Sequence, residues 1–213
     1  MFELDLEKYR VVDISQLVVP PGDEARPFKV ERVTREGKRQ IRYNITTHTH
    51  VGTHVETPFH FIKDGKDPSD FPPTYYMGRA LLVDAQKNQA VDSEHLKEVI
   101  GCKIKPGDII VFRNIEKSRI GENVPYLTQD AAHWLVEKKV KMLVYNYGFF
   151  ALGSTEEKVE ETHDIMMKHD ISFVEFLDNL EELRRKEFYF MALPFKIKGI
   201  DSAWVRAIVI EEK

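Results

Sequence analysis

Apolar residues along the chain follow two patterns, one typical of β-strands and one typical of helices. Short runs rich in β-branched and aromatic residues predict strands at residues 9–14, 29–33, 41–47, 80–84, 109–112, 142–145 and 205–210. Helical spacing of apolar residues predicts helices at 92–100, 128–138, 155–169 and 179–185, with Thr155 or Ser154 as a cap of the third. This order of elements predicts an α/β fold with a final strand near the C-terminus.

The 213 residues contain no internal repeat and no long linker, so we expect one compact domain over residues 1–213. A formal net charge of -4, with acids and bases mixed, gives no basic stripe, and nucleic acid is therefore not an expected partner. The N-terminal segment has no apolar run, which argues against a signal peptide or membrane anchor. We expect a cytoplasmic protein that binds no membrane.

Histidines cluster in one segment of the chain. Four of the eight histidines, together with one carboxylate, fall between residues 48 and 60: His48, His50, His54, Glu56 and His60. Imidazole nitrogen and carboxylate oxygen bind Zn²⁺, Mn²⁺ or Fe²⁺ at roughly 2.0 to 2.2 Å, so ligands of one ion must converge. The single cysteine, Cys102, excludes a cysteine-based cluster, and any metal must be held by histidines and carboxylates.

The spacing within this segment requires a bend. A straight strand holds the backbones of His50 and His54 about 13 Å apart, too far to share an ion. Gly52 lies between them and can adopt the positive φ of a sharp turn. Pro58 favours extended geometry at Thr57. We therefore expect a strand that runs into a tight loop with several donors facing one point.

Each residue of the segment also has a plainer interpretation. His50, His54 and Glu56 are favoured as metal ligands, against a solvated polar loop. His48 precedes the turn and is expected to be structural or to support a ligand. His60 is a ligand, a general acid/base or a hydrogen-bonded core residue.

A second set of donors is expected downstream. His163 and Glu175 are favoured, because Glu175 lies among apolar residues where a buried carboxylate needs a strong partner such as a metal. The alternative is an exposed or lysine-paired Glu175 and a surface His163. The remaining histidines, His95, His133 and His169, are expected to be structural.

The chain resembles the cyclase-type metal-dependent hydrolases, the kynurenine formamidase-like family. The family motif His-x-Gly-Thr-His-x-Asp-x-Pro-x-His matches residues 50–60 with identical spacing, except that Glu56 replaces the aspartate. Further matches at residues 12–15, 21–23, 105–113 and 193–207 extend the resemblance over nearly the whole chain.

The resemblance implies a role for each matching residue. His50, His54 and Glu56 would bind metal, His163 and Glu175 would complete a site for one or two ions, with zinc or manganese favoured, and His60 would be the acid/base. It also implies a compact domain of layered mixed sheets with helices on one side, of the swivelling β/β/α type, assembled as a homodimer or higher homo-oligomer.

Two departures from the family affect the expected chemistry. The extra methylene of Glu56 moves its carboxylate by about 1 Å, which bears on the metal preferred. In the family, the strand that corresponds to residues 142–145 tends to be followed by an Asp and a Ser-containing loop. This chain instead has Asn146, Tyr147, Gly148, Phe149 and Phe150. Phe149 and Phe150 are interpreted as a substrate-binding wall for a planar or apolar small molecule, with core packing as the alternative.

The predicted function is hydrolysis of a carbon–nitrogen bond in an amide, either an aryl formamide or a cyclic amide, by metal-activated water. His60 would move the proton to the leaving nitrogen. Lactone or ester hydrolysis by the same site is an alternative. A further alternative is a binding protein that has kept the metal ligands and lost catalysis.

Overall fold

The computed structural model describes residues 5–34, 37, 39–116, 124–148 and 150–213. Its main sheet has eight strands in the order β1-β12-β11-β5-β7-β9-β10-β4. Their bounds are Tyr9–Asp13 (β1), His54–Glu56 (β4), Met77–Ala85 (β5), Ile109–Asn114 (β7), Met142–Tyr145 (β9), Ser172–Glu175 (β10), Glu187–Pro194 (β11) and Ser202–Glu212 (β12). Two small ribbons pair β2 (Lys29–Thr34) with β3 (Ile41–Thr46) and β6 (Ala90–Val91) with β8 (Tyr126–Leu127).

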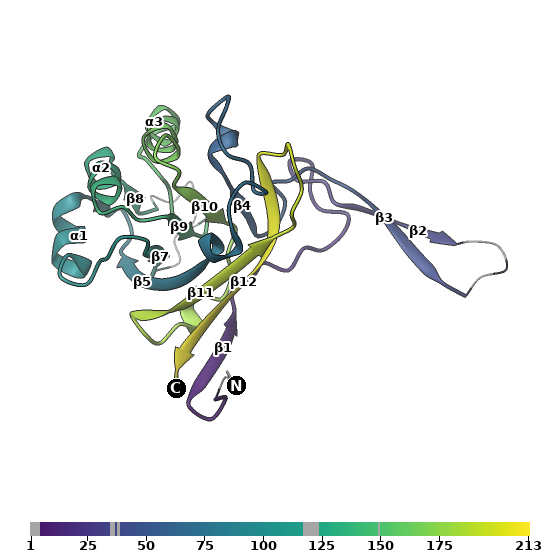
Figure 1. The fold of residues 1–213 in the computed structure, drawn as a ribbon, viewed down its shortest axis with the longest axis horizontal. Coiled ribbons are helices and arrows are strands. Elements are labelled where there is room, and N and C mark those ends of the chain that lie inside the picture. Colours follow the sequence, from purple (N-terminus) through teal and green to yellow (C-terminus); the bar gives the residue numbers. More distant parts are fainter. Residues whose placement is uncertain (1–4, 35–36, 38, 117–123, 149) are drawn as a thin grey trace.

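The main sheet closes on itself through β4. Strands β5, β7, β9 and β10 are parallel neighbours, and β4 pairs antiparallel with β10 on one side and with the start of β12 on the other. In these registers Glu175 lies opposite His54, and Ser202 lies opposite Glu56. Figure 1 shows β4 between β10 and β12. Closure therefore brings three segments that are distant in sequence to one place.

Both faces of the parallel strands are buried, because successive side chains point to opposite sides of a strand. One face contributes Leu81, Val83, Ile110, Phe112 and Leu143 to a core that the helices cover. The other face contributes Ala80, Leu82, Ile109, Val111 and Val144 to a second core, which the antiparallel strands enclose. This arrangement explains why these strands read as continuous apolar runs in the sequence.

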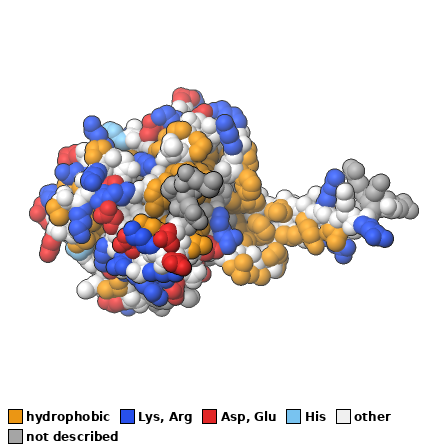
Figure 2. Space-filling model, turned by 60° about the horizontal axis from the view of Figure 1, so that its bottom comes forward, with side chains coloured by type: hydrophobic (Ala, Val, Ile, Leu, Met, Phe, Trp, Pro, Cys, Tyr) orange, Lys and Arg blue, Asp and Glu red, His pale blue; other side chains and the backbone are white. Residues whose placement is uncertain are grey.

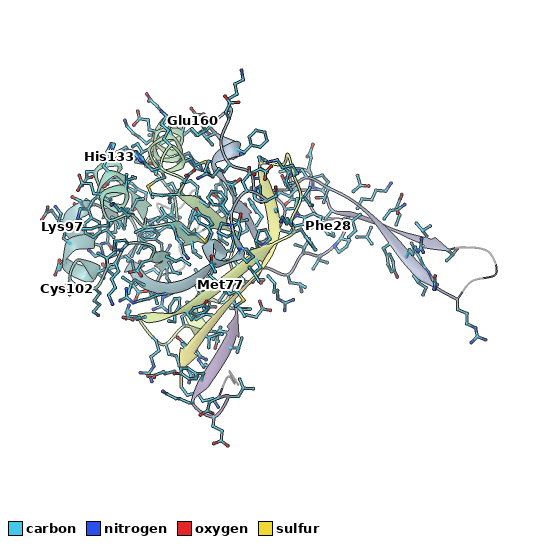
Figure 3. The ribbon with its side chains drawn as sticks, viewed as in Figure 1. Phe28, Met77, Lys97, Cys102, His133 and Glu160 are labelled. Atoms are coloured by element: carbon cyan, nitrogen blue, oxygen red, sulfur yellow. The ribbon has the colours of Figure 1, made fainter. Side chains whose placement is uncertain are left out.

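Three α-helices form a layer on one side of the sheet (Figure 1). They are α1 (Ser93–Ile100), α2 (Gln129–Glu137) and α3 (Glu156–Met167), and short 3₁₀ helices occupy Pro58–His60, Pro73–Tyr76 and Leu180–Glu182. The side chains of Asp92, Thr128 and Thr155 cap the three α-helices by accepting from backbone amides of the first turn. Figure 3 places Lys97, Cys102 and His133 on the outer side of this layer, away from β4. Among the described residues, no helix combines the length and the apolar character needed to cross a membrane.

The observed elements confirm the predicted α/β class, the seven predicted strands and the first three helices. The fourth predicted helix, at residues 179–185, is wrong, because only Leu180–Glu182 form a 3₁₀ turn there. Asn179 has a left-handed backbone with φ 55°, and the amides of Arg184 and Arg185 donate to the Glu211 carboxylate. The strand β11 follows directly and was not predicted.

A two-stranded arm, formed by β2 and β3, projects from the body of the molecule (Figure 1). Cross-strand pairing places Val30 beside Ile45, and Arg32 beside Tyr43, on one face. The apolar side chains on this face are exposed, at 52% for Ile41, 58% for Tyr43 and 51% for Ile45. Figure 2 shows hydrophobic side chains along the arm and at its root. An isolated hairpin is only marginally stable in water, so the arm lacks the packing that normally supports such a ribbon.

Candidate metal centre

The histidine-rich segment is bent sharply before β4. Gly52 has φ 69°, and a Cβ there would lie 2.3 Å from the Val18 side chain, so both its conformation and its surroundings require glycine. Thr57 is extended, with φ -117° and ψ 167°, as expected before Pro58. The backbone therefore turns at Gly52 and then runs through His54 and Glu56 in β4.

The bend gathers the imidazoles around Glu56. Ring centroids of His50 lie 4.9 Å from His54 and 4.7 Å from His60. The Oε1 atom of Glu56 is 2.8 Å from His50 Nδ1, 3.4 Å from His54 Nε2 and 3.9 Å from His60 Nε2. A carboxylate surrounded by imidazole nitrogens at these distances can bind a divalent cation jointly with them.

The downstream pair, His163 and Glu175, reaches the same carboxylate. His163 lies in α3, and its Nε2 is 3.7 Å from Glu56 Oε2. Glu175 ends β10 beside His54. Two groups of donor atoms within 4.8 Å of one another result, one formed by His50, Glu56 and His60 and the other by His54, Glu56 and Glu175. Glu56 belongs to both groups and so lies between two candidate cation sites.

Backbone carbonyls orient two of the rings. His54 Nδ1 lies 2.8 Å from the Gly52 carbonyl oxygen, and His163 Nδ1 lies 2.7 Å from that of Val159. Since Nδ1–H donates to a carbonyl in each case, the other nitrogen, Nε2, is left as the acceptor that faces the cluster. Second partners of this kind fix the tautomer of metal-binding histidines.

The donor set fits a divalent cation. Glu56 is buried, and its Oε2 has no hydrogen-bond partner among the described residues. Burial opposes ionisation of Glu56, but the surrounding imidazoles, His163 foremost, lower its pKa well below the usual value. Burial raises the pKa of Glu175, and the nearby Glu56 charge adds to this effect. A cation between the two carboxylates would satisfy the unpartnered oxygen and remove their mutual repulsion.

Asp201 is a site residue that the sequence reasoning missed. Its Oδ2 lies 2.7 Å from His50 Nε2 and 2.8 Å from His60 Nδ1, and hydrogen bonds from these two rings lower the pKa of Asp201. Its backbone carbonyl accepts from the amide and hydroxyl of Thr57. Residue 201 lies within the family match at 193–207, but only its position directly before β12, beside β4, reveals its contact with the histidines.

Aromatic rings surround the centre. The Phe61 ring stacks on His163 with centroids 4.6 Å apart, and the Phe176 ring stacks on His54 at 5.6 Å and on Tyr147 at 5.1 Å. Phe61 and Tyr147 are 38% and 41% exposed. Phe61 and Tyr147 therefore provide accessible flat surfaces close to the candidate metal donors.

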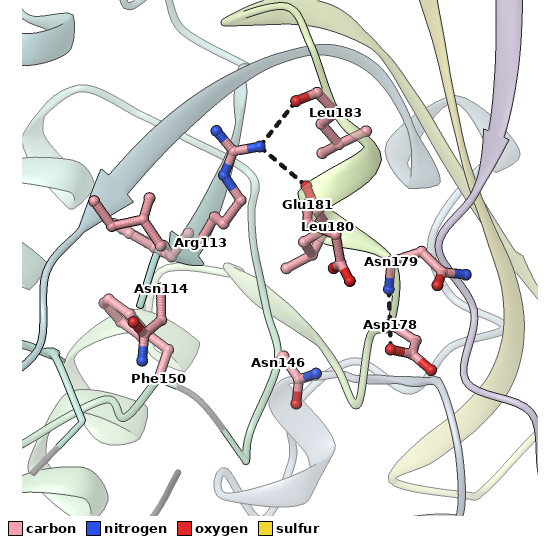
Figure 4. A pocket seen from close by; sticks show the side chains of 11 residues that line it. Arg113, Asn114, Asn146, Phe150, Asp178, Asn179, Leu180, Glu181 and Leu183 are labelled. Carbon is pink, nitrogen blue, oxygen red and sulfur yellow. Dashed lines mark hydrogen bonds between the residues drawn. The ribbon is translucent and has the colours of Figure 1, made fainter. Parts of the chain in front are cut away.

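Of the two phenylalanines that the sequence suggested for substrate binding, the structure describes only Phe150. Phe149 is outside the described residues. Phe150 is 1% exposed and stacks on Phe112 in the core, with ring centroids 4.7 Å apart. It borders a separate cavity of about 330 Å³ at the ends of β7 and β9, shown in Figure 4. Its ring therefore packs as a core residue, which was the alternative interpretation.

The remaining histidines lie outside both donor groups. His48 is closest, with its Nε2 3.1 Å from the Ala25 carbonyl oxygen and its Nδ1 accepting from the His50 amide at 3.2 Å. Its ring thus contacts the backbone of His50. His95 and His133 lie in α1 and α2, and His169 follows α3.

Proteins with similar sequences are hydrolases by name. A kynurenine formamidase of Erythrobacter litoralis (strain HTCC2594) is 29% identical over 213 residues, covering 95% of this chain and 94% of the relative. A kynurenine formamidase of Bacillus cereus (strain ATCC 10987 / NRS 248) is 24% identical over 206 residues, covering 93% and 96%.

Solved structures share the fold. Isatin hydrolase A from Ralstonia solanacearum superposes with a TM-score of 0.78 at 22% identity, covering 95% of this chain and 92% of that chain. A potential metal-dependent hydrolase with cyclase activity superposes with a TM-score of 0.75 at 19% identity, covering 96% and 99%. The family model described as putative cyclase matches residues 9–147, more than half of the sequence, and contains the whole histidine segment. The chain therefore belongs to the Cyclase family.

Proposed function

We propose that this protein is a metal-dependent hydrolase that cleaves the carbon–nitrogen bond of an aryl formamide or a cyclic amide. The observation that carries the proposal is the position of Glu56, which shares one carboxylate between two groups of histidine and glutamate donors. The names of the relatives, kynurenine formamidase and isatin hydrolase, support the same reaction class.

In this proposal His50, His54, Glu56, His163 and Glu175 hold one or two divalent cations, with zinc or manganese favoured by nitrogen and oxygen donors. His50 would bind through Nδ1, because its Nε2 lies 2.7 Å from the Asp201 carboxylate. A bound divalent cation polarises the amide carbonyl and makes a water molecule more acidic.

His60 is the proposed acid/base. Its Nδ1–H donates to Asp201, so its Nε2 faces Glu56 and the reacting atoms. Nε2 takes a proton from the attacking water while the new carbon–oxygen bond forms, and returns it to the leaving nitrogen as the carbon–nitrogen bond breaks. The products are a carboxylic acid and an amine. Asp201 fixes the tautomer of His60 and stabilises the imidazolium that forms in between.

The accessible rings of Phe61, Tyr147 and Phe176 favour a planar aromatic substrate. Aromatic rings stack in offset or tilted geometry, with a gain beyond their buried area. Phe61 stacks on His163, and Phe176 stacks on His54 and on Tyr147. This surface suits the aryl portion of an anilide or of a fused cyclic amide better than an extended aliphatic chain.

The direct test is turnover of the zinc- or manganese-loaded protein with formanilides, benzo-fused cyclic amides and aryl lactones. We expect hydrolysis of at least one amide class, and loss of turnover on chelation with recovery on readdition of metal. Hydrolysis of lactones alone would show that the protein is an ester hydrolase and would contradict amide hydrolysis. If the metal-loaded protein hydrolyses none of these compounds, the proposed hydrolase function is contradicted and a metal-holding binding protein is favoured.

Metal binding is expected to release protons. Burial alone would lower the pKa of His50, but Asp201 and Glu56 raise it from 6.5 to about 10 in the metal-free protein. At pH 7.5 this imidazole is therefore protonated, and the proton must leave before Nδ1 can bind a cation. Apparent zinc affinity should rise with pH, by up to about tenfold per unit below pH 10 for each proton released.

Calorimetric titration of zinc into the chelator-treated protein, at pH 7.5 in two buffers of different ionisation enthalpy, measures this release. Different heats in the two buffers are expected, and the difference should shrink in His50→Gln but persist in His48→Gln. Identical heats in both buffers with the unmodified protein would show that no proton is displaced.

We further propose that the protein is a homodimer in which the arm packs against the body of the partner. On the apolar face of the arm, Ile41, Tyr43 and Ile45 are each more than half exposed, and exposed apolar surface of this kind marks an interface. Residues 29–46 carry six basic and two acidic side chains, whereas the whole chain has a net charge of -4. A basic arm and an acidic body attract each other across a symmetric pair.

Tyr43→Glu should convert the dimer to a monomer, because it buries a charge in the proposed interface. Asn44→Glu is the matched control, since neighbouring residues of a strand point to opposite faces and Asn44 lies on the polar face opposite Glu31. Sedimentation velocity should give a dimer for the unmodified protein and for Asn44→Glu. A monomeric unmodified protein, or equal dissociation in both variants, would refute the arm as the interface.

A further inference from the structure

A short loop before β2 lies against the metal centre. The loop is closed by a bridge between Gly22 and Pro27, and its Arg26 amide donates to Asp23 Oδ1 at 2.6 Å. The neighbouring Ala25 carbonyl lies 3.1 Å from His48 Nε2, and His48 in turn accepts from the His50 amide. The loop is therefore connected to the metal ligands through one histidine.

The loop places a cation beside the centre. The Arg26 guanidinium lies 4.5 Å from the centroid of the Phe176 ring and 5.8 Å from that of Tyr147. Phe176 also stacks on His54, so the guanidinium and a metal-ligand candidate contact the same ring. Within the described ranges, no carboxylate forms an ion pair with Arg26. By contrast, the guanidinium of Arg113, at the cavity of Figure 4, already donates hydrogen bonds to Asp84 and to two backbone carbonyls.

Phe176 is held in an unusual conformation. Its φ is 56°, in the left-handed region that bulky residues rarely adopt, and it directly follows Glu175. The Thr53 hydroxyl donates to its carbonyl at 2.6 Å and so ties it to the histidine segment. Such strain is retained where the surrounding structure fixes a functional position. Here the conformation turns the ring towards His54 and Arg26.

We propose that Arg26 is a specificity-determining residue that binds a carboxylate group on an aromatic substrate. This inference rests on the proposed amide hydrolysis and names the substrate class more narrowly. A guanidinium held close to aromatic rings by cation–π contact retains N–H donors for other contacts, and these match a carboxylate in bidentate geometry. Phe176 and Tyr147 provide the platform, and the hydrolysed amide lies on the side of His54.

Two substrates that differ only in charge test this role. 3-Formamidobenzoate and 3-formamidobenzamide share the ring and the formamide, and the unmodified metal-loaded protein should prefer the carboxylate in kcat/KM. Arg26→Met should lower this preference by about 10- to 100-fold, mainly through KM, as expected for loss of a charge-assisted hydrogen bond. Arg26→Lys should recover only part of it. Arg42→Met, which removes a charge from the polar face of the arm, should leave the preference unchanged.

A binding measurement makes the test independent of turnover. The dissociation constants of benzoate and benzamide are measured calorimetrically on the metal-loaded protein with and without Arg26→Met. Selective weakening of benzoate supports the inference. Equal weakening of both compounds, or none, overturns it even if both formamides are hydrolysed. Failure of the unmodified protein to hydrolyse either formamide would count against the proposed function, while the benzoate comparison would still decide the role of Arg26.

Discussion

His60→Ala should retain bound metal while turnover falls by about 10²- to 10⁴-fold, the usual contribution of a positioned acid/base. The Nε2 atom of His60 lies 3.9 Å from Glu56 Oε1, farther than His50 Nδ1 at 2.8 Å or His54 Nε2 at 3.4 Å. Its other nitrogen is bound to Asp201, which orients the ring without requiring a cation. Metal content by mass spectrometry and kcat on the preferred amide measure the two effects separately.

His48→Ala is the matched control, because His48 lies in the same segment but outside both donor groups. It should lose far less activity. If His60→Ala instead loses the metal together with activity, His60 is a ligand in the group that it forms with His50 and Glu56. Retained turnover with bound metal would remove His60 from the chemistry altogether.

Glu56→Gln should abolish stoichiometric metal binding, the second large effect. Glu56 is common to both donor groups, and a neutral amide supplies neither its charge nor its second acceptor oxygen. We expect metal affinity to fall by more than about 100-fold, the upper range reported for residues that only support a ligand. Turnover should fall with it, and excess metal should restore little.

Glu56→Asp tests the effect of the carboxylate charge separately from the effect of side-chain length. It keeps the carboxylate and shortens it by one methylene, so binding should be weakened less than in Glu56→Gln. Glu160→Gln removes the same charge from an exposed residue of α3 that belongs to neither donor group (Figure 3), and it should bind metal normally. Normal metal content in Glu56→Gln would show that neither cation site depends on this carboxylate.

The local part of the site could be predicted because it depends on short spacing. His50, Gly52 and His54 define a turn whose geometry follows from backbone limits, and the structure has that turn. His163 and Glu175 were named from the resemblance and from the apolar surroundings of Glu175. The structure brings both to Glu56, but their proximity depends on the pairing of β10 with β4, which spacing alone does not determine.

The missed residues have weaker local signals. Asp201 is one carboxylate in a loop, and nothing in its immediate sequence indicates that two imidazoles will reach it. Phe176 was passed over for Phe149 and Phe150, because a pair of adjacent phenylalanines suggests a wall more strongly than one ring after a strand. The left-handed φ of Phe176 decides where its ring points, and β propensity in the sequence does not reveal such a conformation.

The pairing of β4 on both sides affects how the protein acquires its metal. The ligands in β4 lie between Phe173–Glu175 of β10 and Ser202–Trp204 of β12. A growing polypeptide on the ribosome therefore cannot assemble the centre from the histidine segment alone, because its partners are synthesised more than a hundred residues later. Only the donor group of His50, Glu56 and His60 comes from one segment, so the group that includes Glu175 is completed late in biogenesis.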